Sequence, residues 1–281
     1  MSVDLLGISL AVSYIGTPES LADRQLPQWW GRATQAAFLQ AVRQADPELA
    51  DELHRENTQH PYTVSGLLGW RKGTVPTPEM SFHIRLTGLT AKVNDILQCL
   101  TGTGGLFSAG QTIMLDYLPF RIAESAPDAD GGRNYSDLIA AGLTRAEVNV
   151  LDFRFRSPTL FKSKDKTQPL PLPELVFRSL SERWNTFAPV MFPEELLRFA
   201  EECLAISAFN LKSLPVPLKE GVLRIGSIGR VRFRALNADR YWLSLCHTLS
   251  LFAGYAGVGS GTGYGLGQAE VPLPKKKEET A

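Results

Sequence analysis

Residues 257–267 read Gly-Val-Gly-Ser-Gly-Thr-Gly-Tyr-Gly-Leu-Gly, and glycine occupies every second position of this segment. We do not expect a dinucleotide-binding loop, because that motif requires a following helix and an acidic residue about 20 positions further on, whereas 14 residues follow Gly267. A P-loop is excluded because the Gly-Lys-Ser/Thr ending is missing. Two interpretations remain: a flexible loop or bulged hairpin, and a loop whose backbone approaches another chain closely and offers N–H groups to phosphates. The regular repetition favours the second.

The second half of the chain, which contains this glycine-rich loop, predicts one cycle of strands and helices. Period-two alternation of apolar residues predicts strands, and apolar residues three or four positions apart predict helices. On this basis we predict a strand over Val148–Arg156, helices over Pro173–Phe187, Pro193–Ser207 and Tyr241–Phe252, strands within Val222–Ala235, and a last strand over Tyr264–Val271.

The first half of the chain predicts a similar cycle, in the order β-α-β-β-α-β of a ferredoxin-like unit. Its predicted elements are strands over Val3–Tyr14, Tyr62–Trp70, Met80–Thr87 and Leu106–Phe120, helices over Arg32–Ala45 and Thr90–Leu100, and a short helix from Asp46-Pro47 to near His54. We therefore predict an α+β fold of tandem ferredoxin-like domains, 1–126 and 136–274. The polar segment Pro127–Tyr135 is the predicted linker.

The length and composition of the chain limit the classes of protein to which it can belong. With 281 residues, 44% of them hydrophobic and 21% charged, the chain can bury a large core. Cys99, Cys203 and Cys246 lie far apart in apolar stretches without a Cys-x-x-Cys pair, so we expect buried free thiols in a reducing compartment. Met1–Gly16 has no basic segment, and no apolar run reaches the roughly 20 residues of a membrane span. We expect a cytoplasmic protein with no membrane partner.

The distribution of charge is more informative than its sum. The 29 basic residues balance 29 acidic ones, whereas nucleic-acid binders usually carry a basic excess. Basic residues nevertheless concentrate in two predicted strands, where equal parity places them on one face of each strand. They are Arg154 and Arg156 in one strand and Arg230, Arg232 and Arg234 in the other. Such a stripe is often a solvated sheet edge, but two stripes in the half with the glycine-rich loop favour contact with phosphates.

These segments together resemble the RAMP superfamily, and more narrowly its CRISPR-associated repeat-processing endoribonucleases. The superfamily signature is Gly257-x-Gly259, five residues, and Gly265-x-Gly267 after an apolar helix. Other matching segments are Leu53-His54 followed by His60-Pro-Tyr-Thr-Val-Ser65, Ser157-Pro-Thr-Leu-Phe161, Leu172-Pro-Glu-Leu-Val-Phe177, Arg183-Trp-Asn-Thr-Phe187 and Ile228-Gly-Arg-Val-Arg-Phe233. The resemblance implies a RAMP-like (RRM-like) fold and contact of Gly257, Gly259, Gly265 and Gly267 with RNA.

The resemblance also implies a reaction, in which a ribose 2′-OH attacks the adjacent phosphate without metal or cofactor and leaves a 2′,3′-cyclic phosphate. This reaction needs a proton acceptor, a proton donor and positive charge for the phosphorane. His54 stands where the family has its catalytic histidine. His60 stands where some members have a lysine, so it is the second candidate, with Arg71 or Lys72 as the alternative. We expect His83 and Arg85 to face solvent, with contact to RNA as the alternative, and His247 to pack inside a helix.

The expected partner is CRISPR repeat RNA in its precursor form, with other Cas proteins of a prokaryotic effector complex as further partners. A non-catalytic RAMP subunit that binds the processed RNA is the first alternative, because members of one superfamily share a fold without sharing a function. A ferredoxin-like binding module with neither RNA nor catalysis is the second. The segment from His54 to Ser65 separates the first alternative from the nuclease.

Overall fold

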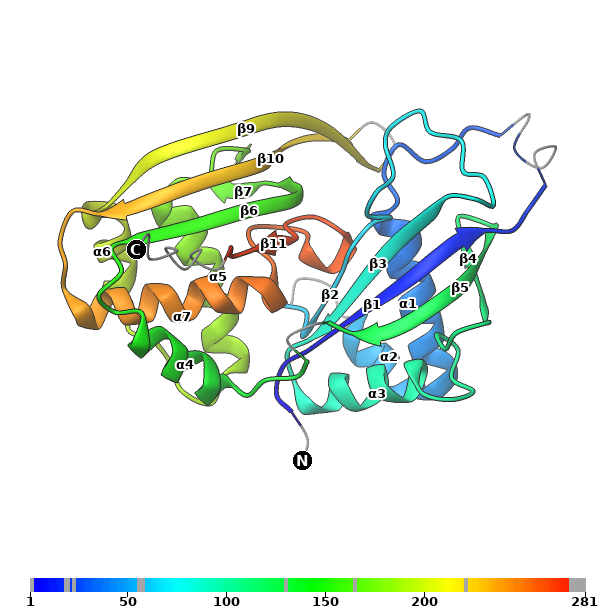
Figure 1. Ribbon diagram of the computed structural model, residues 1–281, viewed down its shortest axis with the longest axis horizontal. Coiled ribbons are helices and arrows are strands. Elements are labelled where there is room, and N and C mark those ends of the chain that lie inside the picture. Colours follow the sequence, from blue (N-terminus) through cyan, green and yellow to red (C-terminus); the bar gives the residue numbers. More distant parts are fainter. Residues whose placement is uncertain are drawn as a thin grey trace, which may run out of the picture.

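Two antiparallel sheets, each covered by helices, lie side by side in the computed structural model (Figure 1). The structure describes residues 3–17, 21, 24–54, 59–128, 131–163, 166–219 and 222–272. The predicted strand-helix cycles correspond to the two halves of the molecule. The α+β fold with two ferredoxin-like units is thereby confirmed.

The first half is built around a five-stranded sheet of order β2-β3-β1-β5-β4. Its elements are β1 (Leu6–Tyr14), α1 (Gly31–Ala45), α2 (Pro47–Leu53), β2 (Tyr62–Val64), β3 (Ser81–Gly88), α3 (Ala91–Thr101), β4 (Thr112–Leu115) and β5 (Leu118–Pro127). Leu10 pairs with Ile84 in the centre of this sheet, and both side chains are buried. Without α2 and β4, the order and connections are those of a ferredoxin-like unit.

The second half repeats this topology in a four-stranded sheet of order β11-β6-β10-β9. Its elements are α4 (Tyr135–Thr144), β6 (Val150–Thr159), β7 (Phe161–Ser163), β8 (Lys166–Gln168), α5 (Pro173–Phe187), α6 (Glu195–Cys203), β9 (Leu204–Lys219), β10 (Val222–Ala235), α7 (Arg240–Ala256), a 3₁₀ turn (Thr262–Tyr264) and β11 (Ala269–Glu270). Strands β7 and β8 form a separate hairpin.

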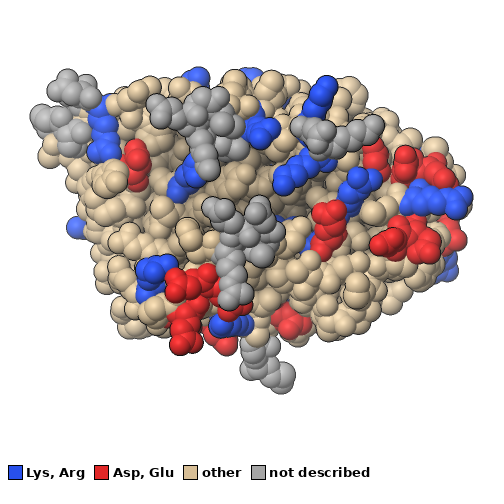
Figure 2. Space-filling view, turned by 180° about the vertical axis from the view of Figure 1, so that it is seen from behind, with Lys and Arg blue, Asp and Glu red and all other residues tan. Residues whose placement is uncertain are grey.

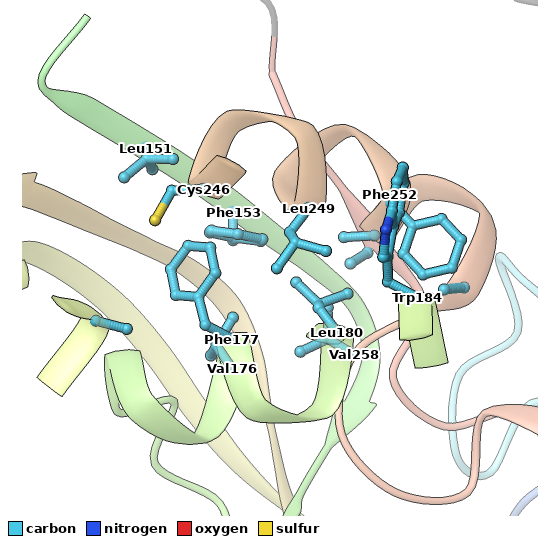
Figure 3. Close-up of a cluster of buried hydrophobic side chains, with 14 of the residues drawn as sticks. Leu151, Phe153, Val176, Phe177, Leu180, Trp184, Cys246, Leu249, Phe252 and Val258 are labelled. Carbon is cyan, nitrogen blue, oxygen red and sulfur yellow. The ribbon is translucent and has the colours of Figure 1, made fainter. Parts of the chain in front are cut away.

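Helix α5 has the bounds that its sequence pattern predicts, and its packing explains why. Pro173 begins the helix, where its missing N–H costs nothing. Val176, Phe177, Leu180 and Trp184 follow at helical spacing and are fully buried. Figure 3 shows these side chains packed against residues of β6 and α7. One face of α5 is therefore fixed in the core, and the other is available to line a site.

Several predicted elements of the sequence analysis are wrong in their extent. The strand predicted over Tyr62–Trp70 is β2, which ends at Val64. The helix predicted over Pro193–Ser207 ends at Cys203, because Leu204 already pairs with Ala235 as the first residue of β9. The strand predicted over Leu106–Phe120 is a hairpin, since Asp116 and Tyr117 have φ of 50 and 63 and reverse the chain. The sequence analysis also missed α4 and β9 as separate elements.

The last strand, predicted over Tyr264–Val271, is reduced to β11, Ala269–Glu270. Gly261 and Gly265 adopt left-handed φ values of 80 and 95 on either side of the 3₁₀ turn. Left-handed residues and a 3₁₀ turn both interrupt the extended backbone of a strand. The predicted linker agrees with the end of β5 at Pro127 and the start of α4 at Tyr135. The boundaries 1–126 and 136–274 stay predictions, and residues 129–130, 273 and 274 lie outside the described residues, as do Lys275, Lys276 and Lys277.

Two smaller expectations need correction or extension. Cys246 is buried, but Cys203 is partly exposed and Cys99 is exposed, so the prediction of three buried thiols is wrong. Cys99 lies on the outer face of α3, whose buried side is formed by other residues. In the described part of the chain, no helix combines the length and the apolar character that crossing a bilayer would demand.

Candidate active site and RNA interface

A cavity of about 690 Å³ lies where the glycine-rich loop, helix α5 and the segment before β2 meet. Both halves of the molecule contribute to it, since Gln59 and His60 come from the first half and the remaining lining from the second. The polar side chains of its lining are Gln59, His60, Lys162, Arg178, Ser179, Glu182, Arg183, Ser260, Thr262 and Tyr264. This combination of a histidine with several cations suits a phosphodiester substrate.

Protein contacts hold the glycine-rich loop against this cavity. The N–H of Gly259 donates to Ser179 Oγ at 3.0 Å, and the N–H of Ser260 donates to the carbonyl oxygen of Leu160 at 2.9 Å. A side chain at Gly259, where φ is +79, would overlap the Leu160 carbonyl oxygen. Glycine is therefore required at this position by both conformation and space.

The four glycines predicted to contact RNA have different surroundings. Gly259 is half-buried and lines the cavity. Gly257, Gly265 and Gly267 are buried, and a Cβ at Gly265 would lie 2.8 Å from the Cα of Gly31 in the other half of the molecule. These three glycines let protein backbones approach each other, and contact of any of the four with RNA stays a prediction.

His60 is the predicted catalytic residue that lines the cavity. Its ring lies 5.2 Å from the Tyr62 ring, and a Cβ at Gly263 would lie 3.1 Å from its Cδ2 atom. Burial lowers the pKa of His60 below 6.5, and the positive charges of Arg183 and His54 lower it further. His60 is therefore neutral at neutral pH, as a proton acceptor must be.

His54 is exposed and forms the C-terminal cap of α2. The sequence sets this position, because Asp46 caps the N-terminus of the helix by accepting a hydrogen bond from the N–H of Leu49 at 2.9 Å. His54 is close enough to His60 for its charge to lower the His60 pKa. The charge of His54 thus acts on His60, but His54 itself does not line the cavity.

The alternative second candidates, Arg71 and Lys72, are exposed and are not part of the cavity lining. Sequence reasoning missed the cations that are part of it, Lys162, Arg178 and Arg183. Arg183 is 5% exposed, and burial lowers the pKa of its guanidinium to about 10. Arg178 is one turn before Glu182 on α5, and a helical pattern with charges at this spacing is usually a solvated face. The sequence therefore gives no sign that this face lines a cavity.

The predicted arginines project from the face of the second sheet opposite to its aromatic core. Phe153, Phe155 and Phe233 are buried, whereas the intervening arginines of β6 and β10 are exposed, as the alternation predicts. Arg154 and Arg230 are paired residues of neighbouring strands. None of the five predicted arginines, Arg154, Arg156, Arg230, Arg232 and Arg234, lines the cavity.

Carboxylates already neutralise part of this stripe. Arg232 donates from both Nε and Nη2 to the carboxylate of Asp152, with Nη2 3.0 Å from one carboxylate oxygen. The guanidinium of Arg156 lies 3.3 Å from the carboxylate of Glu270. Figure 2 shows one face of the molecule, on which Lys and Arg gather over the upper and middle part while Asp and Glu gather at the lower edge and one end. On this face, basic side chains prevail over the upper and middle part, whereas the lower edge and the end carry side chains of both signs.

The three remaining residues of the sequence analysis, His247, His83 and Arg85, have different surroundings. His247 is buried in α7, with Nε2 2.7 Å from the carbonyl oxygen of Val148, so its predicted packing role is confirmed. His83 is exposed as predicted, but Arg85 is not simply solvent-facing. Its Nε donates to Asp128 at 2.7 Å and its Nη1 to the carbonyl oxygen of Gly254 at 2.5 Å, so it joins the two halves.

Among the residues that the structure describes, no three His, Cys, Asp or Glu side chains come together as a metal site would require.

Comparison with known proteins agrees with this architecture. Residues 153–269 match the family model of the CRISPR-associated endoribonuclease Cas6. A product complex of a Thermus thermophilus Cas6 shares the fold with a TM-score of 0.74 at 23% identity, over 95% of this chain and 100% of that one. A product complex of a second Cas6 has a TM-score of 0.72 at 24% identity, over 96% and 99% of the two chains.

A more distant structure, described as a RAMP protein binding different RNA substrates, has a TM-score of 0.60 at 11% identity, over 95% of this chain and 100% of that one. No curated protein matches the sequence. The match of residues 153–269 lies in the half that contains the arginine stripes, α5 and the glycine-rich loop. Residues 153–269 thus resemble the Cas6 family, and nearly the whole chain shares the fold of these Cas6 and RAMP structures.

Proposed function

We propose that this protein is a metal-independent endoribonuclease that cleaves CRISPR repeat RNA and so converts precursor RNA into its mature form. The observation that supports the proposal best is the cavity in which neutral His60 meets Lys162, Arg178 and the glycine-rich loop. The Cas6 product complexes with the same fold support repeat RNA as the substrate class. We infer a cytoplasmic, prokaryotic protein from this substrate.

The proposed reaction is an internal transesterification of RNA. The ribose 2′-oxygen forms a bond to the adjacent phosphorus, and the bond from phosphorus to the 5′-oxygen of the next nucleotide breaks. His60 takes the proton of the 2′-OH, and His54, at the end of α2, gives a proton to the leaving 5′-oxygen. Lys162 and Arg178 stabilise the negative charge that develops on the phosphorane. The products are a 2′,3′-cyclic phosphate and a 5′-OH.

The proposal is tested with radiolabelled repeat RNA in EDTA. We expect cleavage to continue, because the attacking group belongs to the RNA, and a single 2′-deoxy substitution at the scissile nucleotide should abolish it. The upstream product should resist phosphatase until mild acid opens its cyclic phosphate. Cleavage that stops with EDTA and returns with Mg²⁺ would contradict the mechanism.

A second outcome distinguishes the alternative function. If the wild-type protein binds repeat RNA tightly but leaves it intact under all these conditions, the non-catalytic RAMP subunit becomes the better account. If it neither binds nor cleaves repeat RNA, both RNA functions fail together. Association with other Cas proteins is a separate proposal that pull-down of the assembled effector complex tests.

A further inference from the structure

Arg183 is a buried cation for which the proposed reaction, as described above, has no role. Its side chain starts from α5 in the second half of the molecule and is 5% exposed. No ion pair joins it to a carboxylate within the described ranges, and its Nε is buried without a hydrogen-bond partner. A buried charge of this kind costs stability unless it is paired. Core packing therefore does not explain why an arginine occupies this position.

The remaining guanidinium nitrogens connect the two sides of the cavity. Nη1 donates to Thr262 Oγ1 at 2.5 Å, within the 3₁₀ turn of the glycine-rich loop. Nη2 donates to the carbonyl oxygen of His60 at 3.0 Å, in the segment that leads into β2 of the first half. One rigid fork thus fixes the distance between the loop and the residue proposed to accept the proton.

The His60 ring is confined by the same arrangement. Gly263, the neighbour of Thr262, leaves room for the ring, since a Cβ there would lie 3.1 Å from His60 Cδ2. A shift of the loop would therefore displace the ring as well as the backbone of His60. The charge of Arg183 also opposes protonation of this ring.

We propose that Arg183 is a positioning residue, whose guanidinium fork holds His60 and the glycine-rich loop in the one arrangement in which His60 can accept a proton from the RNA. This inference rests on the proposed nuclease function. It assigns Arg183 no contact with RNA: the residue acts through His60 and Thr262, and it keeps His60 neutral by its charge.

Three variants of the full chain separate geometry from charge. Thr262→Val removes the hydroxyl that accepts from Nη1 and keeps the charge, Arg183→Lys keeps the charge and loses the planar fork, and Arg183→Met loses both. Arg198→Met is the matched control, since Arg198 is exposed on α6 and, within the described part of the chain, forms an ion pair with Glu202 alone. Each variant is examined by thermal unfolding, by its affinity for 2′-deoxy repeat RNA and by its single-turnover cleavage rate with intact RNA.

Thr262→Val and Arg183→Lys should lower the saturating cleavage rate about 10- to 100-fold, the order expected for a misplaced catalytic group, while affinity stays within about 3-fold. Arg183→Met should in addition raise the pKa of His60, followed by NMR in the RNA-free protein with the signal assigned by His60→Gln. Equal losses of affinity and rate in all three variants would instead assign Arg183 to RNA binding and overturn the proposal. Rates equal to that of Arg198→Met would overturn it too.

The cleavage assay and the NMR titration also distinguish a failure of this inference from a failure of the proposed function. If wild-type protein fails to cleave repeat RNA, the nuclease proposal fails, but the NMR titration still tests the link between Arg183 and His60. A His60 pKa that is unchanged in folded Arg183→Met would then overturn the link. If Arg183→Met does not fold, Thr262→Val and Arg183→Lys decide the outcome through their rates.

Discussion

The surroundings of His60 change the pKa of its ring and thereby suit the residue to its proposed role as proton acceptor. A histidine in solution has a pKa near 6.5, so at neutral pH a quarter or so of its molecules would be protonated. In this protein burial, then the charges of Arg183 and His54, lower that pKa. The result is a ring that is neutral under the conditions in which a proton acceptor is needed.

The pH dependence of cleavage follows from this shift. A neutral His60 accepts the 2′-OH proton, so the rate should fall as pH decreases through the His60 pKa. Because that pKa is lowered, the midpoint of the acid limb should lie below 6.5. Single-turnover rates with protein well below saturation report the free enzyme and provide the measurement. A midpoint above 6.5 would assign the limb to another group.

The sequence could predict His60 but not Arg183, although both line the cavity. His60 lies in a segment whose order of residues is recognisable, between a short capped helix and the β2 strand. Arg183 lies on a helix whose other charged residues are exposed, and its burial depends on a loop about 80 residues away in the chain. Long-range contacts of this kind leave no local pattern.

At the scale of elements, the glycine-rich loop needs glycine for two separate reasons. The backbone adopts a left-handed conformation, and there is no space for a side chain. Gly259 and Gly104 have the same φ of +79, but a Cβ at Gly104 would meet nothing within 4 Å, whereas one at Gly259 would overlap the Leu160 carbonyl oxygen. Both Gly→Ala changes carry the cost of a left-handed backbone, about 1–2 kcal/mol.

We expect Gly259→Ala to lower Tm more than Gly104→Ala and, in addition, to weaken binding of repeat RNA, because the displaced loop lines the cavity. Thermal unfolding and a filter-binding titration of both variants provide the measurement. Equal behaviour of the two variants would show that the loop accommodates a side chain at Gly259 without consequence.

The exposed arginines of β6 and β10 form the second element for which we predict contact with RNA. Arg154 and Arg230 face each other across neighbouring strands, and like charges in this position destabilise a sheet. Arg232 is already paired with Asp152. The stability of the sheet therefore does not explain why arginines occupy positions 154 and 230. A negatively charged partner that binds both side chains explains it better.

Charge removal at these positions should reveal that partner. Arg154→Gln and Arg230→Gln should each weaken RNA binding and reduce the salt slope by about 0.7 to 0.9, the value for one lost phosphate contact. Arg232→Gln should change both quantities less, because Asp152 already compensates its charge. Affinity measured against salt concentration tests this, and identical slopes for all proteins would show that the stripe faces away from RNA.

Local sequence patterns predicted the bounds of elements that have one buried face. They failed where pairing with a distant strand sets the boundary of an element. The bounds of α5 follow from Pro173 and the buried residues after it. In contrast, residues 204–207 continue the apolar spacing of α6 but extend into β9, because β10 supplies the pairing partner. The glycine-rich loop was recognisable as a motif, yet the role of Gly265 against Gly31 became visible only in the folded molecule.

At the scale of the whole molecule, the site exists because two similar halves meet in a fixed orientation. Thr87 Oγ1 donates to the carbonyl oxygen of Tyr255 at 2.6 Å, and Arg85 donates to that of Gly254 at the C-terminal end of α7. The glycine-rich loop follows directly and reaches across to the first half, where Ser65 and Gly265 form a bridge. His60 of one half thereby meets the cations of the other.

The most direct test of this account compares cleavage and binding in the same preparations of wild type, His54→Ala and His60→Ala. A positioned acid or base contributes about 10²- to 10⁴-fold, so each substitution should lower the single-turnover rate in EDTA by that order. Affinity for 2′-deoxy repeat RNA should stay within a few-fold, because the cations and the loop are intact. Wild-type cleavage rates in both histidine variants would contradict the account.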